Sequence, residues 1–578
     1  MSTILIYYDG DCPFCSRYAS LVDLRRHGDI QLVNLRDAPE QRHQFFEQGL
    51  DPDKGMVVEI DGKLYGGADA MHMISLLDRK NSSAAKITRL AFSNRLIATA
   101  LYPVLRLGRN TLLLFLGRER LAAGSVAQSR NELFLTAFGI FCWLHLLVYA
   151  FQFGAPIYPS TVAIGLLGIW LTIRPLEKRL VITLVALMIA DAWLQAPSLS
   201  NHTILKNFLL FGSLLAAAWH SIRGNSFENF MRSVIGISRW LLLIMYFFGV
   251  FHKINAGFLN PETSCSTALW EQMPAWLGWI SFSSFGHLTS WGTLVIESAI
   301  GLSLLSPRFR RFGILSGIVF HSLLALSGYA LYATFSMLSL LLHLSFISSR
   351  DARCITSSDL WKKWRAIRRT RTGLIATLAF AGLLCVLAWN RSYAQVGLIW
   401  IILVSPLVIM LITQPSVRDH IGPRQLLVLE PKLLYIVPLL FFFNGFAPYI
   451  GLKTAQSMNM FANLSLEGGK SNHYLIRNVG PFGYLDDIVI IKDASGSSDL
   501  VSVATQGLGM VYYDLLDQLD REPDASVTFV RDSITYIDQS KETLQSDINQ
   551  LLHSRAMRKW FHFNVVDFTE PKPCALDR

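Results

Sequence analysis

Residues 234–252 read VIGISRWLLLIMYFFGVFH, with Arg239 as the one side chain that is always charged. As a helix, an apolar run of this length crosses about 30 Å of hydrocarbon. Similar runs recur between about residues 132 and 450, and only 16% of the chain is charged. Soluble domains usually carry about a quarter charged residues. The sequence therefore predicts a polytopic integral membrane protein with the lipid bilayer as a partner.

The apolar stretches predict a bundle of about eleven transmembrane helices. The stretches are residues 132–153, 160–175, 180–196, 204–222, 234–252, 287–305, 312–328, 330–348, 373–390, 395–413 and 432–450. Both ends of the chain lack such stretches and have the composition of ordinary soluble protein. Three parts are expected: a small α/β domain over residues 1–120 that ends in interfacial helices, a transmembrane domain over 130–450, and an α+β domain over 451–578.

The positions of the basic residues predict the topology. A net charge of +10 could indicate a nucleic-acid partner, but the basic residues cluster in every second loop between apolar runs. The positive-inside bias explains this pattern, so no nucleic-acid partner is expected. The start of the chain has a strand-like ILIYY and no secretory signal pattern. We expect a multi-pass protein of the plasma (inner) membrane, with a cytoplasmic N-terminus and an extracytoplasmic C-terminal domain.

The sequence YDGDCPFC places Cys12 and Cys15 three residues apart, after a strand and at the expected start of a helix. A helix N-terminus stabilises a thiolate, which favours Cys12 as nucleophile and Cys15 as resolving thiol. Half of a zinc site, or two buried thiols, are the alternatives. No second CxxC or CxxH follows in this region, so no metal is expected. The other cysteines stand singly and predict no disulfide framework: Cys142, Cys265, Cys354, Cys385 and Cys574.

This motif resembles the Asp-x-x-Cys-x-x-Cys signature of the DCC thiol-disulfide oxidoreductases, with Asp9, Cys12 and Cys15 in the three named positions. The resemblance covers about residues 1–120. It implies a thioredoxin-like fold, catalysis by these three residues, and a thiol or disulfide electron partner.

Two further elements of that family are present. DGKLYGGADA begins at Asp61, and Asn94 and Arg95 resemble a downstream asparagine-arginine pair. One feature of thioredoxin itself is missing, because no proline directly precedes MVVEI. The usual loop with a cis-proline is therefore not expected.

Ionisable residues deep in membrane helices are functional candidates. Glu297 and His321 fall near the middle of two successive helices and could face each other, as substrate-binding residues or as a structural polar pair. Lys253 ends a helix on the expected outer side, against the charge bias. A desolvated lysine can act as a base, whereas a structural lysine would snorkel to the headgroups. Asp191 and His343 also lie in helices, without an evident partner.

The pattern Y-x-x-G-x-x-x-K around Lys253, followed by TSWGTLVIESAIGLSLL and GIVFHSLLALSGYALYATFSMLSLLLHL, resembles the HTTM family. That family includes the vitamin K-dependent gamma-carboxylases. The resemblance places Lys253 where these enzymes keep the lysine that deprotonates vitamin K hydroquinone. It also implies that Glu297, His321 and Phe335 are landmarks of the family pattern.

Together these features favour an enzyme: a membrane-bound thiol-disulfide oxidoreductase fused to an HTTM, carboxylase-like membrane domain. The thiols and Lys253 are expected on opposite faces of the bilayer, about 30 Å apart. A quinone, a vitamin K-like hydroquinone or another lipid-soluble substrate would bridge that distance. The alternatives are a proton-coupled membrane transporter, with Glu297 and His321 on its pathway, and a redox-responsive membrane scaffold.

Overall fold

A computed structural model of the chain describes residues 4–10, 12, 30–35, 37, 38, 41, 45, 50, 52, 55–77, 92–95, 97–99, 101, 102, 105, 126–152, 158–196, 200–274, 286–327, 330–390, 392–413, 421–469, 471–551, 554–569, 572 and 574. The chain divides into two compact units, Met1–Ser129 and Arg130–Arg578. Each unit is described by itself.

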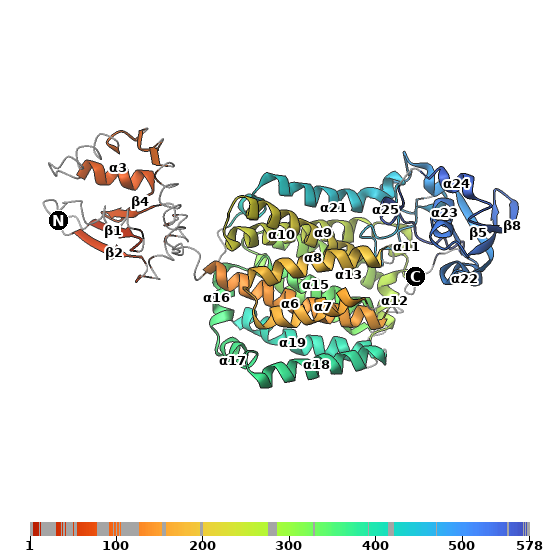
Figure 1. Cartoon of the computed structure of the whole chain (residues 1–578), viewed down its shortest axis with the longest axis horizontal. Coiled ribbons are helices and arrows are strands. Elements are labelled where there is room, and N and C mark those ends of the chain that lie inside the picture. The colour runs from red at the N-terminus through yellow and green to blue at the C-terminus, as the bar shows by residue number, and fades with distance from the viewer. Residues whose placement is uncertain are drawn as a thin grey trace. The chain divides into compact units, whose positions relative to one another are not determined.

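The first unit contains a four-stranded mixed sheet with the order β2-β1-β3-β4 (Figure 1). Strand β1 (Ile4–Tyr8) pairs in parallel with β2 (Ile30–Asn34) and antiparallel with β3 (Val57–Ile60), which pairs antiparallel with β4 (Lys63–Gly66). Helix α3 (Ala68–Leu77) follows. Apolar side chains from β1, β3 and α3 form one core with Cys12. This small α/β unit agrees with the expected fold class.

The second unit is mostly helical, and every apolar stretch expected from the sequence forms a helix. These helices are α6 (Val126–Gln152), α7 (Pro159–Ile173), α8 (Lys178–Gln195), α9 (Asn201–Ile222), α10 (Phe227–Phe251), α13 (Gly286–Leu305), α14 (Arg310–Leu324), α15 (Ala330–Leu344), α18 (Arg371–Trp389), α19 (Tyr393–Thr413) and α21 (Ile436–Phe446). Shorter helices connect them: α11 (Ala256–Leu259), α12 (Cys265–Glu271), α16 (Ser349–Ser357) and α17 (Asp359–Ile367).

The expected number of eleven spans is not confirmed. Within the described residues, four helices are long and apolar enough to cross a membrane, or up to six if each of two bent helix pairs counts as one span. Helices α7, α14 and α15 have 15 residues each. Such a helix is about 22 Å long, which is less than the hydrocarbon thickness. Apolar composition predicted the helices correctly, but it overestimated how many of them reach spanning length.

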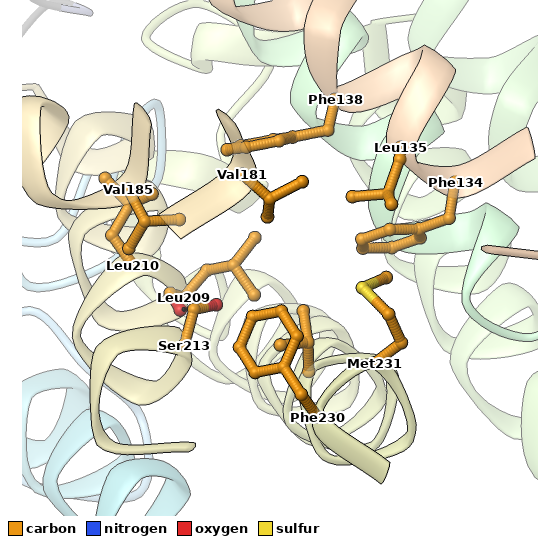
Figure 2. A pocket seen from close by; sticks show the side chains of 11 residues that line it. Phe134, Leu135, Phe138, Val181, Val185, Leu209, Leu210, Ser213, Phe230 and Met231 are labelled. Carbon is orange, nitrogen blue, oxygen red and sulfur yellow. Dashed lines mark hydrogen bonds between the residues drawn. The ribbon is translucent and has the colours of Figure 1, made fainter. Parts of the chain in front are cut away.

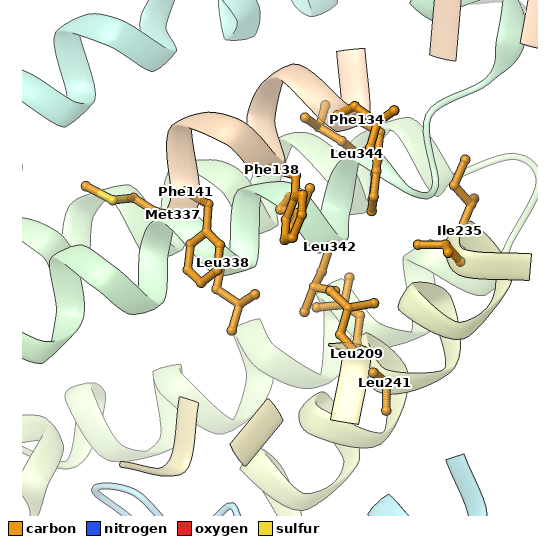
Figure 3. Packing of buried hydrophobic residues seen from close by; sticks show 14 of the residues in the cluster. Phe134, Phe138, Phe141, Leu209, Ile235, Leu241, Met337, Leu338, Leu342 and Leu344 are labelled. Atoms are coloured by element: carbon orange, nitrogen blue, oxygen red, sulfur yellow. The ribbon is translucent and has the colours of Figure 1, made fainter. Parts of the chain in front are cut away.

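The bundle has an apolar centre. Figure 3 shows Phe138, Leu209, Leu241 and Leu342 from α6, α9, α10 and α15 directed toward one another. All four side chains are buried. Packing of this kind joins helices through dispersion and close fit, and the buried polar side chains provide specificity.

The loops gather at two ends of the bundle, α16 and α17 at one end and the C-terminal sheet with α11 and α12 at the other (Figure 1). At the first end, Arg239 donates to the carbonyls of Ser345 and Leu426, and Arg310 donates to that of Ile421. Arg310 and the three accepting carbonyls lie in or beside the loops that are basic in the sequence, whereas Arg239 reaches them from within α10. We call this the basic end, and the opposite one the sheet end.

The C-terminal sheet is antiparallel, with the order β6-β5-β7-β8. Its strands are β5 (Ile488–Ser495), β6 (Gly509–Val511), β7 (Ser526–Arg531) and β8 (Ile534–Ser540), and its helices include α22 (Ser498–Thr505) and α23 (Tyr512–Arg521). A disulfide joins Cys265, at the start of α12, to Cys574 across 309 residues of sequence. The expectation that these two cysteines stand singly was therefore wrong, because the fold brings distant segments together.

Candidate functional site

The thiol site begins directly after β1. The backbone N–H of Cys12 donates to the carbonyl of Asp9 at 3.1 Å, which closes a tight turn. Both side chains are buried, Cys12 completely. Because a thiol must be reached by its partner to react, exchange at Cys12 requires its buried surroundings to move. Cys15 and the helix expected after Cys12 lie outside the described residues.

The neighbouring strand β2 supports the turn. The N–H of Gly10 donates to Oδ1 of Asn34 at 2.9 Å, and Nδ2 of Asn34 donates to Asp37 at 2.7 Å. A Cβ at Gly10 would come within 2.5 Å of the Asn34 side chain. Glycine at this position therefore lets the amide of Asn34 hold the turn before Cys12. Sequence reasoning missed Asn34 because its role depends on strand pairing across 24 residues.

The second family element has a structural role in the described residues. Asp61 and Gly62 both have positive φ in the two-residue turn between β3 and β4, as such hairpins require. Asp69, in the first turn of α3, accepts from Arg95 at 3.0 Å. Both side chains of this ion pair are exposed, so it contributes little stability but links the segment near Arg95 to α3.

The structure brings Lys253 and Glu297 together. Nζ of Lys253 lies 2.8 and 2.6 Å from the two carboxylate oxygens of Glu297, and the two side chains are only 10% and 11% exposed. A Cβ at Gly249 would lie 3.4 Å from Oε2 of Glu297, so the glycine of the Y-x-x-G-x-x-x-K pattern makes room for the carboxylate. Lys253 does not snorkel, since its ammonium is buried against a carboxylate.

His321 has different partners from those expected. No hydrogen bond joins it to Glu297 in the described residues; its Nε2 instead lies 3.0 Å from the hydroxyl of Tyr246. The same hydroxyl lies 3.0 Å from Nε2 of His343. The expectation that His343 lacks a partner was therefore wrong. Phe335 packs its ring edge-to-face with His321 at 5.0 Å.

A second buried polar cluster surrounds Asp191, which was also expected to lack a partner. Ser160, Thr161 and Gln195 all donate to its carboxylate, at 2.7, 2.9 and 2.6 Å. Lys206 on α9 is 4% exposed and lies within electrostatic range of Asp191. The sequence analysis did not single out Lys206, although a lysine inside an apolar stretch is a signal that could have found it.

The sheet end of this region is covered by residues 454–463. The carbonyl of Ser457 lies 3.0 Å from Nε2 of His252, and that of Ala462 accepts from Asn255 at 2.6 Å. Four non-glycine residues of this segment have positive φ: Gln456, Met458, Phe461 and Asn463. Left-handed conformations at such residues cost of order 1 kcal/mol each and persist only where surrounding contacts fix them. The segment is thus held in one conformation above Lys253.

Lys453, directly before this segment, is buried with one amide partner, Oδ1 of Asn444 at 3.2 Å. Burial lowers the pKa of Lys453 to about 7. No carboxylate forms an ion pair with it among the described residues. Lys453 can therefore lose its proton near neutral pH.

One small cavity lies between α6, α8, α9 and α10, and Figure 2 shows apolar side chains such as Phe138, Leu209 and Met231 around it. Its volume is about 20 Å³, space for about one water molecule. Met231 lies in the first turns of α10, and Lys253 follows 22 positions later, two residues past its end; most of this stretch is helix, with a rise of about 1.5 Å per residue. The cavity is a packing gap near the basic end and does not belong to the Lys253 site.

Among the described residues, no group of three or more histidine, cysteine, aspartate or glutamate side chains could hold a metal ion.

Comparison with known proteins gives one positive result. Residues 6–114 match the family of DCC1-like thiol-disulfide oxidoreductases. No curated protein and no solved structure matches the chain at a significant level. The resemblance to HTTM proteins and carboxylases gains no support from these comparisons. Residues 6–114 therefore form a DCC1-like thiol-disulfide oxidoreductase domain, carried by a chain whose remainder is mostly helical and includes four to six apolar helices of spanning length.

Proposed function

We propose that the protein is a membrane thiol-disulfide oxidoreductase that transfers electrons between a thiol partner at Cys12 and Cys15 and a lipid-soluble, quinone-like substrate near Lys253. The observation that carries this proposal is the buried ion pair of Lys253 and Glu297 in the same chain as a DCC1-like domain. Electron transfer between the two sites would explain why a dithiol domain is fused to a helical bundle.

The ion pair suits proton-coupled chemistry because either partner can lose its charge. Transfer of one proton from Nζ of Lys253 to Glu297, over a contact of 2.6 Å, leaves a neutral amine and a neutral acid. In a low-dielectric site this exchange removes two buried charges at once. The amine that results is a base for a hydroquinone hydroxyl, the role that the HTTM-like pattern implies for Lys253, and the neutral acid of Glu297 can protonate a quinone that has accepted electrons.

We place the basic end in the cytoplasm and the sheet end outside it. The basic loops favour this orientation, and α6 enters the bundle at the basic end, where Glu132 binds Arg365 and Arg368. The disulfide of Cys265 and Cys574 suits an oxidising compartment. An apolar carrier would then connect chemistry on the two faces of the membrane.

Turnover of the full-length protein in lipid nanodiscs tests the proposal. Dithiothreitol supplies the dithiol and duroquinone accepts its two electrons and two protons, giving a disulfide and durohydroquinone. We expect turnover above the protein-free rate, lost in both Cys12→Ser and Lys253→Arg and kept in the control Cys354→Ser. Wild-type rates in Cys12→Ser or Lys253→Arg would contradict the proposed roles.

A second candidate, a proton-coupled transporter, is favoured by the cluster of Asp191 and Lys206. Lys206 is buried and forms no hydrogen bond or ion pair with the described residues, whereas Asp191 already accepts three hydrogen bonds. Lipid extraction of the purified protein with mass spectrometry distinguishes the two candidates. A bound quinone supports the oxidoreductase, and a bound polar solute supports the transporter.

A further inference from the structure

Tyr246, His321 and His343 form a hydrogen-bonded chain in which the donor and the acceptor of each contact are fixed. Nδ1 of His343 lies 2.7 Å from the carbonyl oxygen of Ser339. A carbonyl oxygen only accepts, so Nδ1 carries the proton. Nε2 of a neutral His343 is then bare and accepts the hydroxyl proton of Tyr246.

The hydroxyl of Tyr246 also fixes the tautomer of His321. The hydroxyl of Tyr246 has a single proton, which it gives to His343, so its contact with Nε2 of His321 requires an N–H on that nitrogen. Nδ1 of neutral His321 is then a bare lone pair. That atom is buried and has no hydrogen-bond partner among the described residues. An unfilled buried acceptor is costly and calls for a functional explanation.

The chain lies next to the ion pair. Arg239 and Tyr246, seven residues apart, share one face of α10, and Lys253 follows another seven residues on, two past the end of that helix. His321 is within electrostatic range of Lys253, and Tyr246 is within that of Glu297. The open acceptor, the phenol and the ion pair therefore belong to one polar region inside the bundle.

We infer that His321, Tyr246 and His343 are an oriented proton relay that takes up the proton of a hydroquinone at Lys253 and Glu297 and, run in reverse, returns a proton to a quinone that has accepted electrons. The inference rests on the proposed function for the identity of the substrate. The substrate O–H bond breaks and its electron pair stays on oxygen, while the proton is passed to Nδ1 of His321. The Nε2 proton of His321 moves to the Tyr246 oxygen, and the Tyr246 proton moves to Nε2 of His343. The substrate becomes an anion and His343 a cation, so charge is conserved.

In this relay Tyr246 and His343 are positioning residues for proton transfer, because they act on the substrate only through His321. Tyr246→Phe keeps the ring and removes the hydroxyl that joins the two imidazoles. We expect it to reduce duroquinone turnover by about 100-fold, within the usual range for lost acid-base catalysis. The apparent KM should stay near the wild-type value, because the relay carries protons and does not hold the ring.

Gly317 offers a second way to break the relay without removing a member. A Cβ there would lie 2.0 Å from Nε2 of His343, so Gly317→Ala must displace that imidazole. The matched control is Gly292→Ala, where a Cβ would meet nothing within 4 Å. We expect Gly317→Ala to lose turnover as Tyr246→Phe does and Gly292→Ala to keep it. Normal turnover in Gly317→Ala with a displaced His343 would overturn the relay.

Solid-state ¹⁵N NMR of histidine-labelled protein tests the direction independently of turnover. Without substrate, we expect His321 protonated at Nε2 and His343 at Nδ1, with signals assigned by His321→Gln and His343→Gln. A proton on Nδ1 of His321 in the resting protein would overturn the inference, whatever the protein does with quinones.

Durohydroquinone, with its dimethyl ether as a control that lacks hydroxyl groups, separates the relay from the proposed function. We expect durohydroquinone alone to generate a cationic His343 in the wild type and not in Tyr246→Phe. Turnover of duroquinone with His343 still neutral would overturn the relay and leave the oxidoreductase intact. The expected resting tautomers in a protein without quinone turnover would support the relay and reject the quinone-like substrate.

Discussion

The two ends of the bundle each contain a buried ion-paired cluster, but the clusters differ in chemistry. At the basic end, Glu132 accepts from Arg365 at 2.8 Å and from Arg368 at 3.0 Å. Arg368 also donates to the carbonyl of Thr172 on α7. Guanidinium groups do not give up a proton in proteins, so this cluster is permanently charged. It fastens α6, α7 and the end of α17 to one another.

The other cluster begins with Lys253 at the sheet end and extends into the bundle as far as His343, and it is built from groups that exchange protons. Lys253 and Glu297 form a single pair, and the nearby side chains are a phenol and two imidazoles. Two buried ion pairs of similar exposure therefore predict opposite responses to mutation. Breaking the arginine cluster should cost stability, whereas a conservative change in the lysine pair should cost activity.

Glu132→Gln should have the largest effect on stability. It leaves Arg368, which is 4% exposed, without its counter-charge inside the bundle. Breaking a buried pair from one side typically costs about 3–5 kcal/mol. We expect low membrane abundance and a strongly lowered melting temperature in detergent. The control Asp359→Asn removes an exposed pair with Lys362 and should melt like the wild type. Equal melting of Glu132→Gln and wild type would remove the structural role of the basic-end cluster.

Cys574→Ser should have the next largest effect. It removes the link between α12 and the C-terminal segment, and loss of a disulfide typically costs about 2–5 kcal/mol. We expect this variant and the reduced wild type to melt together, below the oxidised wild type. In intact cells, a membrane-impermeant maleimide should label the half-buried Cys574 in the matched variant Cys265→Ser. Labelling that requires permeabilised membranes would reverse the orientation proposed for the sheet end.

Lys453→Met should have a smaller effect that depends on pH. The pKa of Lys453 falls from about 10.4 in the unfolded chain to about 7 in the folded protein. Between these values the unfolded state binds a proton that the folded state does not. This lysine therefore makes stability rise with pH, by up to about 1.4 kcal/mol per pH unit. Below pH 7 its destabilising contribution is constant.

Melting curves between pH 6 and 10 test this sign. Lys453→Met should remove the rise seen in the wild type and should be the more stable protein at pH 6. Lys492→Met, at an exposed position of β5, is the control and should preserve the wild-type slope. A steeper rise in Lys453→Met than in the wild type would show that Lys453 is stabilised in its charged form.

Short-range sequence patterns predicted the helices and the thiol domain of this molecule. Apolar stretches identified all of the long helices, and the CPFC motif identified the thiol domain that the family comparison supports. The partners of buried polar groups were not predictable. The contacts of Lys253 with Glu297 and of Tyr246 with His343 join positions 44 and 97 residues apart. The sequence gives the position of such residues along a helix, but the rotation and packing of the helices decide which side chains are in contact.

The cysteines show the same limit in another way. Spacing predicts that Cys12 and Cys15 lie close together because three residues fit about one helical turn, and Cys15 lies outside the described residues. It missed the disulfide of Cys265 and Cys574, whose 309-residue separation carries no periodic signal. The number of spans was overestimated because helix length was judged from apolar composition, while helices such as α14 end early in the structure.

Lys253→Arg should have the smallest effect on stability and the most specific effect on activity. A guanidinium can keep the ion pair with Glu297, so we expect a loss within about 1 kcal/mol and normal membrane abundance. Arginine does not give up its proton, so it cannot act as the base, and duroquinone turnover should disappear.

Lys253→Met is a poorer test, because it buries Glu297 without a counter-charge and should destabilise the bundle. The matched control is Lys559→Arg, at a sheet-end lysine that donates to the carbonyl of Trp193 and should keep wild-type activity. Full turnover by Lys253→Arg at normal abundance would make the lysine pair a structural clamp like the arginine cluster and would remove the chemical difference between the two ends.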